Sequence, residues 1–183
     1  DGYDNVILDF LRGAGTGSEI AKASYDIAVL GSNVGSWGWS DVGGFGDEGI
    51  KPGFGSTTFF NVNTLDDAGW GTALSADVLV ILSHTSCGGC DLDNAGVIAI
   101  NSRSVQIASA FNAGMDIWGN SGASNADYYD FLPPGVTTSG PPISGSSGFV
   151  ATAAGVAIGI TPEMINGDPT HNRFVDFADA FTV

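Results

Sequence analysis

The chain has 183 residues, of which 43% are hydrophobic, and its 20 acidic and 5 basic side chains give a formal net charge of -15 at pH 7. This length fits one domain with a single hydrophobic core. The excess of carboxylates argues against nucleic-acid binding, which needs clustered lysine and arginine, and the lack of any run of about 20 apolar residues argues against membrane insertion.

The first 31 residues predict a strand, a loop and a helix. Residues 5–10 form a short apolar run typical of a strand, and the glycines within 13–17 predict a loop. From Ser18 onward, apolar residues recur every three or four positions until Gly31, which is helical spacing. The run Ile27-Ala-Val-Leu30 is alternatively a strand, because periodicity does not separate the two structures in short apolar runs.

A loop rich in glycine and aromatic residues is predicted over 32–56. Long segments of this kind in a compact domain commonly contact other molecules. We therefore expect an interface built from four aromatic side chains, namely Trp37, Trp39, Phe45 and Phe54. The alternative is that these side chains cover one end of the core.

The middle of the chain predicts strands that alternate with a helix. Residues 57–62 and 115–119 are short strands, whereas 77–82 is a continuous apolar run of the kind found when both faces of a sheet are covered. Helical spacing extends over 94–112 and ends at Gly114. A strand, helix and strand of these lengths form a right-handed parallel unit.

The C-terminal part, residues 135–183, is rich in serine, glycine, alanine and threonine. Alternation over 148–160 predicts short strands, and 174–183 predicts a terminal strand. The fold class that follows is α/β: a single three-layer domain over 1–183, with a mostly parallel central sheet and an added β-rich C-terminal segment.

Cys87 and Cys90 are the only cysteines of the chain and are separated by two glycines. Because they fall in a loop after a strand, we expect a disulfide that staples the loop, which also favours an extracellular location. Two alternatives stay open. The pair is a metal site with His84, or it is redox-active.

The two carboxylates that follow, Asp91 and Asp93, match the first half of a calcium loop, with Gly96 at the expected turn. The bidentate carboxylate of such a loop is missing, because Ser102 stands in its place. Asp93 is alternatively the N-cap of the predicted helix over 94–112.

Ser121 lies between small residues in Gly119-Asn-Ser-Gly-Ala123, after a predicted parallel strand. Small neighbours are what a strained nucleophile turn between strand and helix requires. His171 follows later in the chain, and Asp168 or Asp130 is available to orient it, so the sequence offers a catalytic triad. The alternative is that Ser121 only ends a strand and His171 is held in a turn.

Three segments between Ala76 and Ala123 carry a family resemblance: the apolar run 77–82, Phe111-Asn-Ala-Gly114, and Asp116-Ile-Trp-Gly119 with the turn at Ser121. The stretch resembles the class I glutamine amidotransferase-like version of the flavodoxin-like fold. The resemblance implies a central parallel sheet with the nucleophile at Ser121. The family has cysteine there, so glutamine hydrolysis is not expected.

The segment from Asp77 to Val183 also resembles secreted bacterial proteins that often carry a PEP-CTERM sorting tail. The phrases that carry this likeness are 83–90, 128–134, 143–148 and 166–174. The resemblance implies export to the cell surface or the extracellular matrix, and it implies no activity.

Taken together, these patterns favour a secreted structural or adhesive protein that self-associates into a surface layer or filament. Unpaired carboxylates favour stabilisation by calcium, and nothing indicates an organic cofactor. The alternatives are a secreted serine hydrolase that uses Ser121 and His171, and a calcium-dependent ligand-binding module.

Overall fold

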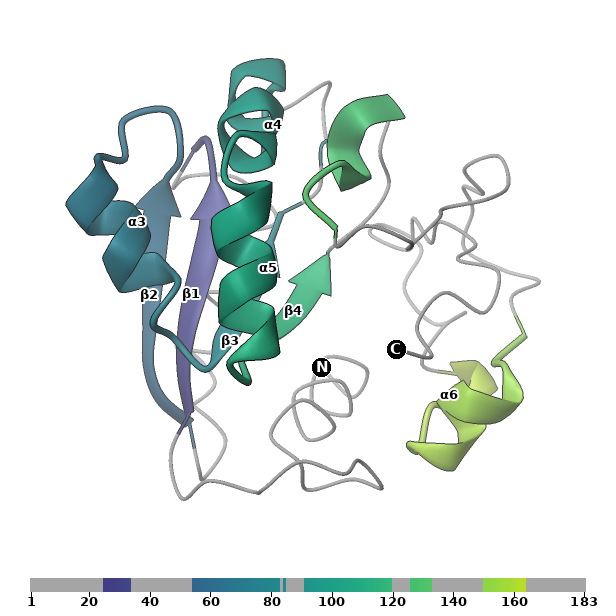
Figure 1. The fold of residues 1–183 in the computed structure, drawn as a ribbon. Helices are drawn as coiled ribbons and strands as arrows, with labels where there is room; N and C mark the ends of the chain where they lie inside the picture. The colour runs from purple at the N-terminus through teal and green to yellow at the C-terminus, as the bar shows by residue number, and fades with distance from the viewer. Residues whose placement is uncertain are drawn as a thin grey trace.

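The computed structural model describes residues 25–33, 54–82, 84, 91–119, 126–132 and 150–163. Four strands form one sheet in which every neighbouring pair is parallel. The order across the sheet is β2-β1-β3-β4 (Figure 1). The strands are β1 (Tyr25–Gly31), β2 (Phe54–Asn61), β3 (Val78–Ile81) and β4 (Asp116–Gly119).

Helices connect these strands along one face of the sheet. Helix α3 (Asp67–Ala73) joins β2 to β3, and helices α4 (Asn94–Asn101) and α5 (Ser104–Asn112) join β3 to β4. Both connections step across the sheet in the same direction, so right-handed crossovers put all three helices on one face, as Figure 1 shows. Within the described residues, no helix is long and apolar enough to cross a bilayer.

The central strands β1 and β3 are buried on both faces. Ala28 and Leu30, with Leu79 and Ile81, join the core beneath the helices. Their alternate neighbours face the other way and are also buried, at 2% exposure or less: Ile27, Val29, Val78 and Val80. The predicted α/β fold with a parallel sheet is therefore confirmed, and its strand order is that of a flavodoxin-like domain.

The helix predicted to end at Gly31 is wrong over residues 25–31, where the structure has strand β1. The alternative strand over Ile27–Leu30 is confirmed. Because β1 lies between β2 and β3 and is covered on both faces, its apolar residues do not alternate with polar ones. Such a run matches helical spacing by coincidence.

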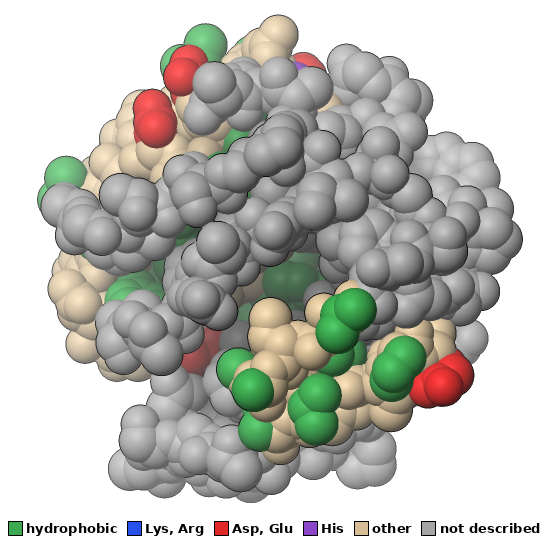
Figure 2. Space-filling model, turned by 90° about the vertical axis from the view of Figure 1, so that its right-hand side faces the viewer, with side chains coloured by type: hydrophobic (Ala, Val, Ile, Leu, Met, Phe, Trp, Pro, Cys, Tyr) green, Lys and Arg blue, Asp and Glu red, His purple; other side chains and the backbone are tan. Residues whose placement is uncertain are grey.

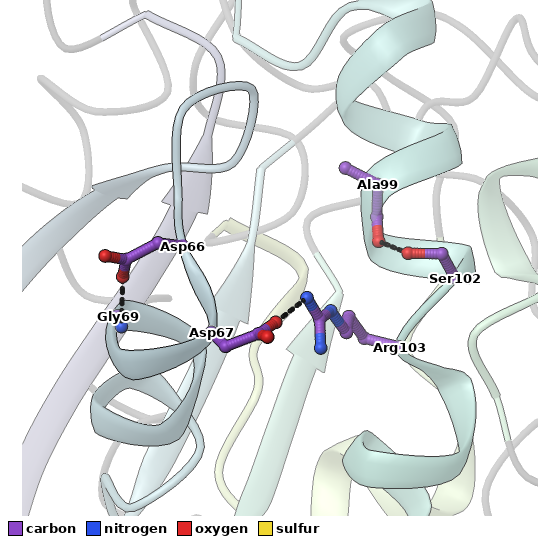
Figure 3. A network of polar contacts seen from close by, with 6 residues as sticks. All are labelled: Asp66, Asp67, Gly69, Ala99, Ser102 and Arg103. Atoms are coloured by element: carbon purple, nitrogen blue, oxygen red, sulfur yellow. Dashed lines mark hydrogen bonds and ion pairs between the residues drawn. The ribbon is translucent and has the colours of Figure 1, made fainter.

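The single helix predicted over 94–112 is two helices, α4 and α5, with a break at Ser102 and Arg103. At the break the Ser102 hydroxyl donates to the carbonyl oxygen of Ala99 at 2.7 Å, as Figure 3 shows. A serine hydroxyl that bonds to the preceding turn competes with the helical pattern. The predicted strands at 57–62, 77–82 and 115–119 correspond to β2, β3 and β4.

The short strands predicted over 148–160 are wrong for the described residues 150–163, which contain helix α6 (Ala153–Ala157). Thr152 Oγ1 accepts a hydrogen bond from the Gly155 amide at 3.1 Å and so caps this helix. Val150 and Val156 are 86% and 60% exposed. Figure 2 shows hydrophobic side chains gathered over this segment. The rest of 135–183, and the strand predicted at 5–10, lie outside the described residues.

Arg103 joins α3 to the start of α5. Its guanidinium lies 2.5 Å from an Asp67 carboxylate oxygen and 5.5 Å from the centroid of the Trp70 ring (Figure 3). At a site open to water the contact with Trp70 contributes roughly 0.5–1 kcal/mol, and the ion pair with the exposed Asp67 contributes roughly 0–1 kcal/mol. Arg103 thus holds the helical layer together at the surface, above a buried Trp70.

Gly96, in the first turn of α4, is expected to tolerate no larger residue. An added Cβ would lie 2.6 Å from Ser32 Oγ and from a Leu92 methyl group, and 3.0 Å from Val62. Gly96→Ala should therefore lower the free energy of unfolding by about 1–3 kcal/mol. Urea denaturation measures this change.

Gly71 supplies the matched control, because a Cβ there meets nothing within 4 Å on an exposed part of α3. Gly71→Ala should raise the free energy of unfolding by up to about 1 kcal/mol. Equal effects of the two substitutions would contradict the tight approach of α4 to β1.

Candidate functional site

The candidate site lies at the carboxyl edge of the sheet, where the arrowheads of Figure 1 point. The chain leaves β1 for β2 on one side and returns to β3 on the other, so β1 and β3 flank a topological switch point. Ligands of open parallel sheets bind at such points, beyond the carboxyl ends of the strands. We use the name carboxyl edge for the last residue of β2, the described residues that follow β1, β2 and β3, and those that lead into and begin α4: Ser32, Asn33, Asn61–Thr64, Leu82, His84 and Asp91–Asn94.

Asp93 makes side-chain hydrogen bonds to three segments of this edge. Its carboxylate accepts hydrogen bonds from the Gly96 amide at 2.7 Å, from Ser32 Oγ at 3.0 Å, and from Asn63 Nδ2 at 3.0 and 3.2 Å. The Asp93 amide in turn donates to Ser32 Oγ at 3.1 Å. One side chain therefore fastens the start of α4 to the segments that follow β1 and β2.

Hydrogen bonding and burial act in opposite directions on the Asp93 carboxyl. Burial raises its pKa, but the bonds from Gly96, Ser32, Asn63 and the backbone of Ala95 outweigh burial and leave the pKa below its ordinary value of 3.8. Each bond favours the charged form. The carboxylate is therefore ionised at neutral pH.

The ends of β1 and β2 are joined by a second set of contacts around Asn61. Its Nδ2 donates to the carbonyl oxygen of Ser32 at 3.1 Å, and its Oδ1 accepts from the Asn63 amide at 3.0 Å. Asn63 is thereby oriented toward Asp93. The ends of β1 and β2 thus meet through a bond from a side chain to a backbone carbonyl 29 residues away in sequence.

The backbone of Asp91 packs directly on the end of β1. Its carbonyl oxygen accepts from the Ser32 amide at 2.7 Å and lies 3.0 Å from where a Cβ of Gly31 would stand. A side chain at position 31 would force this carbonyl, or the chain around it, to shift. The Asp91 side chain is itself 1% exposed, so a carboxylate is held in the interior at this edge.

His84 stands three residues past the end of β3 and is 7% exposed. Its Nε2 lies 2.8 Å from Oδ1 of Asn94, the first residue of α4. With a carbonyl oxygen facing it, Nε2 of the neutral ring carries the proton and Nδ1 does not. The contact with Asn94 thus holds the ring in place at the carboxyl edge and favours the tautomer that is protonated at Nε2.

Tyr128, which follows β4 in the chain, contacts the end of β3 at this edge. It belongs to the short helix η2 (Ala126–Tyr129) and is 1% exposed. Its Oη lies 3.0 Å from each of the carbonyl oxygens of Ile81 and Leu82. Burial, together with the charges of Tyr129 and Asp91, raises the pKa of Tyr128 well above its ordinary value of 10.0, so the phenol stays protonated and donates.

The structure places two of the predicted metal ligands, Asp91 and Asp93, at this edge. The alternative role of Asp93 as the N-cap of α4 is confirmed. Among the described residues, no group of three or more His, Cys, Asp or Glu side chains is arranged to hold a metal ion. Calcium binding by Asp91 and Asp93 stays a prediction.

The other predicted site residues lie outside the described residues: the candidate triad Ser121, His171 and Asp168, the pair Cys87 and Cys90, and the interface residues Trp37, Trp39 and Phe45. The fourth interface residue, Phe54, opens strand β2. The disulfide, the triad and the aromatic interface therefore stay predictions.

Sequence reasoning missed most of the carboxyl edge. It weighed His84 only as a partner for the cysteines and did not single out Ser32, Asn63 or Tyr128. A signal for His84 was present, since it follows the strongest predicted strand, and side chains just past parallel strands commonly bind ligands. Asn63 gave the same signal, since it directly follows the strand predicted over 57–62. Tyr128 gave none, because its partners are remote in sequence.

Comparison with known proteins gives no match among family models, curated proteins or solved structures.

Asp93→Asn should lower the free energy of unfolding at pH 7 by about 1–3 kcal/mol, because bonds to a charged acceptor are lost while the cap is kept. The pKa of Asp93 is lowered by folding, so its contribution is complete above 3.8 and disappears as the pH falls below that value. Urea denaturation at pH 7 and pH 3 should show that the variant and the wild type differ less in their free energy of unfolding at pH 3.

Asp66→Asn is the matched control at the N-cap of α3, where the Asp66 carboxylate accepts a hydrogen bond from the Gly69 amide at 2.8 Å (Figure 3). Its effect at pH 7 should be smaller than that of Asp93→Asn. If the difference in unfolding free energy between wild type and Asp93→Asn were the same at pH 7 and pH 3, the Asp93 side chain would not stabilise the protein through its charge.

Proposed function

We propose that the chain is a secreted adhesive domain that binds an uncharged, hydroxyl-rich ligand, such as an extracellular glycan, at its carboxyl edge. The observation that carries this proposal is the polar network at the switch point, where Asp93, Ser32, Asn61 and Asn63 brace one side and His84 with Asn94 the other. Rigidly supported polar side chains are what selective binding requires.

The chemistry of the edge supports a neutral ligand. It offers amide, hydroxyl, imidazole and carboxylate groups, which form paired hydrogen bonds with vicinal hydroxyls. The described residues of the carboxyl edge include no lysine or arginine, and the chain carries a net charge of -15. Phosphate and other anions would meet repulsion there.

The extracellular location and the adhesive role rest on sequence. The acidic surface and the paired Cys87 and Cys90 support export, as does the likeness to secreted bacterial proteins. Self-association into a layer or filament, and stabilisation by calcium, belong to the same proposal. A ligand site at one edge leaves the rest of the surface for contacts between copies.

The proposal predicts that ¹⁵N-labelled protein titrated with maltotriose, cellotriose and chitotriose shows amide shifts at the carboxyl edge for at least one sugar. Ser32, Asn63 and Asn94 are the reporters. His84→Ala should weaken that binding by at least about tenfold, since a buried hydrogen-bonding group is lost. Repeating the titration in calcium chloride and in EDTA tests the calcium requirement.

Asp26→Asn is the control at the opposite end of β1, where the Asp26 carboxylate accepts from the amide and hydroxyl of Ser56 at 2.7 and 2.9 Å. Affinity for the sugar should not change in this variant. Shifts that map to the amino edge of the sheet, or no shifts with any of the three sugars, would overturn the proposal.

A secreted serine hydrolase is a second candidate, and the position of His84 favours it. Strand β4 pairs with β3 so that Gly119 lies opposite Ile81, and both strands end at the same edge. Ser121 follows Gly119 by two residues in sequence. His84, three residues past the end of the neighbouring strand β3, is then the candidate base in place of the predicted His171.

This second candidate predicts covalent labelling of the native protein by a fluorophosphonate probe, measured by intact mass. Ser121→Ala should abolish labelling, and His84→Ala should slow it at least about tenfold, while His171→Ala leaves it unchanged. Absence of labelling in the wild type would remove the hydrolase candidate and leave the sugar-binding proposal intact.

A further inference from the structure

The described residues contain a closed ring of contacts that passes through His84. From the end of β3 the chain leads to His84, whose ring bonds to Asn94 at the start of α4. At the other end of α4, Asn101 Nδ2 donates to the carbonyl oxygen of Asp127 in η2 at 2.7 Å. Tyr128, the next residue, returns to β3 through its hydroxyl.

Within this ring the Tyr128 hydroxyl contacts the backbone at the end of β3, where the Leu82 amide also donates to the carbonyl oxygen of Leu30 at 3.1 Å. The hydroxyl bonds to the carbonyl oxygens of Ile81 and Leu82, each at 3.0 Å. Those carbonyls belong to the last residue of β3 and the residue after it. Their peptide planes set the direction in which the chain leaves the strand.

We infer that Tyr128 is a positioning residue for His84: its hydroxyl fixes the end of β3 and thereby the place and tautomer of the imidazole. This inference rests on the proposed function for its purpose, since His84 is the group expected to meet the ligand. It also makes η2, which follows β4, part of the support of the site.

The ring of Tyr128 has a separate role in packing, which allows the hydroxyl to be tested alone. Its centroid lies 4.6 Å from that of Tyr129 and 6.1 Å from that of Phe131, both edge-on. Phenylalanine at position 128 keeps these contacts and removes only the donor. The effect of the hydroxyl on the position of His84 can therefore be measured without loss of the aromatic packing around residue 128.

The experiment follows the two imidazole nitrogens of His84 by long-range ¹H–¹⁵N NMR in the full chain, with His171→Gln to assign the signals. In Tyr128→Phe the Nδ1 and Nε2 shifts of His84 should move toward the average of the two tautomers. Affinity for the sugar that binds best should fall at least about threefold. Tyr129→Phe, which removes the neighbouring hydroxyl, should leave both readouts unchanged.

Asn101→Ala removes a second contact of the closed ring, the bond from Asn101 to Asp127. This variant should move the same His84 signals if Tyr128→Phe fails to fold. A lower melting temperature in Tyr128→Phe with unchanged His84 nitrogen shifts would overturn the inference and leave Tyr128 a packing residue. If the shifts move but His84→Ala binds sugar like the wild type, the positioning role stands and the proposed function fails.

Discussion

The carboxylate of Asp93 is the interaction on which the rest of the carboxyl edge depends. It satisfies the first turn of α4 and at the same time holds Ser32 after β1 and Asn63 after β2. Parallel strands leave their loops at one edge with backbone groups that need partners. A single ionised side chain supplies acceptors for three of these segments, so the loops keep a fixed geometry around the switch point.

A fixed geometry matters because a binding site must hold its polar groups before the ligand arrives. His84 and Asn94 lie at the start of the same helix that Asp93 caps, and η2 braces the far end of that helix through Asn101. Displacement of α4 would therefore alter the position of His84. Close packing reinforces this, since Gly31 and Gly96 leave no space for a side chain where α4 and its preceding loop meet β1 and β2.

The success of sequence reasoning differed from element to element for physical reasons. Strand β3 was predicted because four consecutive apolar residues are buried on both faces. The N-cap at Asp93 was recognised because capping is a contact between near neighbours. Strand β1 carries the same kind of apolar run, but matching helical spacing obscured it. The break between α4 and α5 was missed because one hydroxyl bond at Ser102 decides it.

The sequence by itself determined the α/β class, the parallel pairing implied by buried apolar strands, and the acidic surface. These properties depend on local composition and on contacts between residues close in the chain. Tertiary structure alone decided that β1 lies between β2 and β3, that Asn63 reaches Asp93, and that Tyr128 reaches Ile81. Hydrogen bonds between residues 30 or 47 positions apart leave no periodic pattern in the sequence, because they join single side chains to partners in remote segments, which include the backbone of the apolar Ile81.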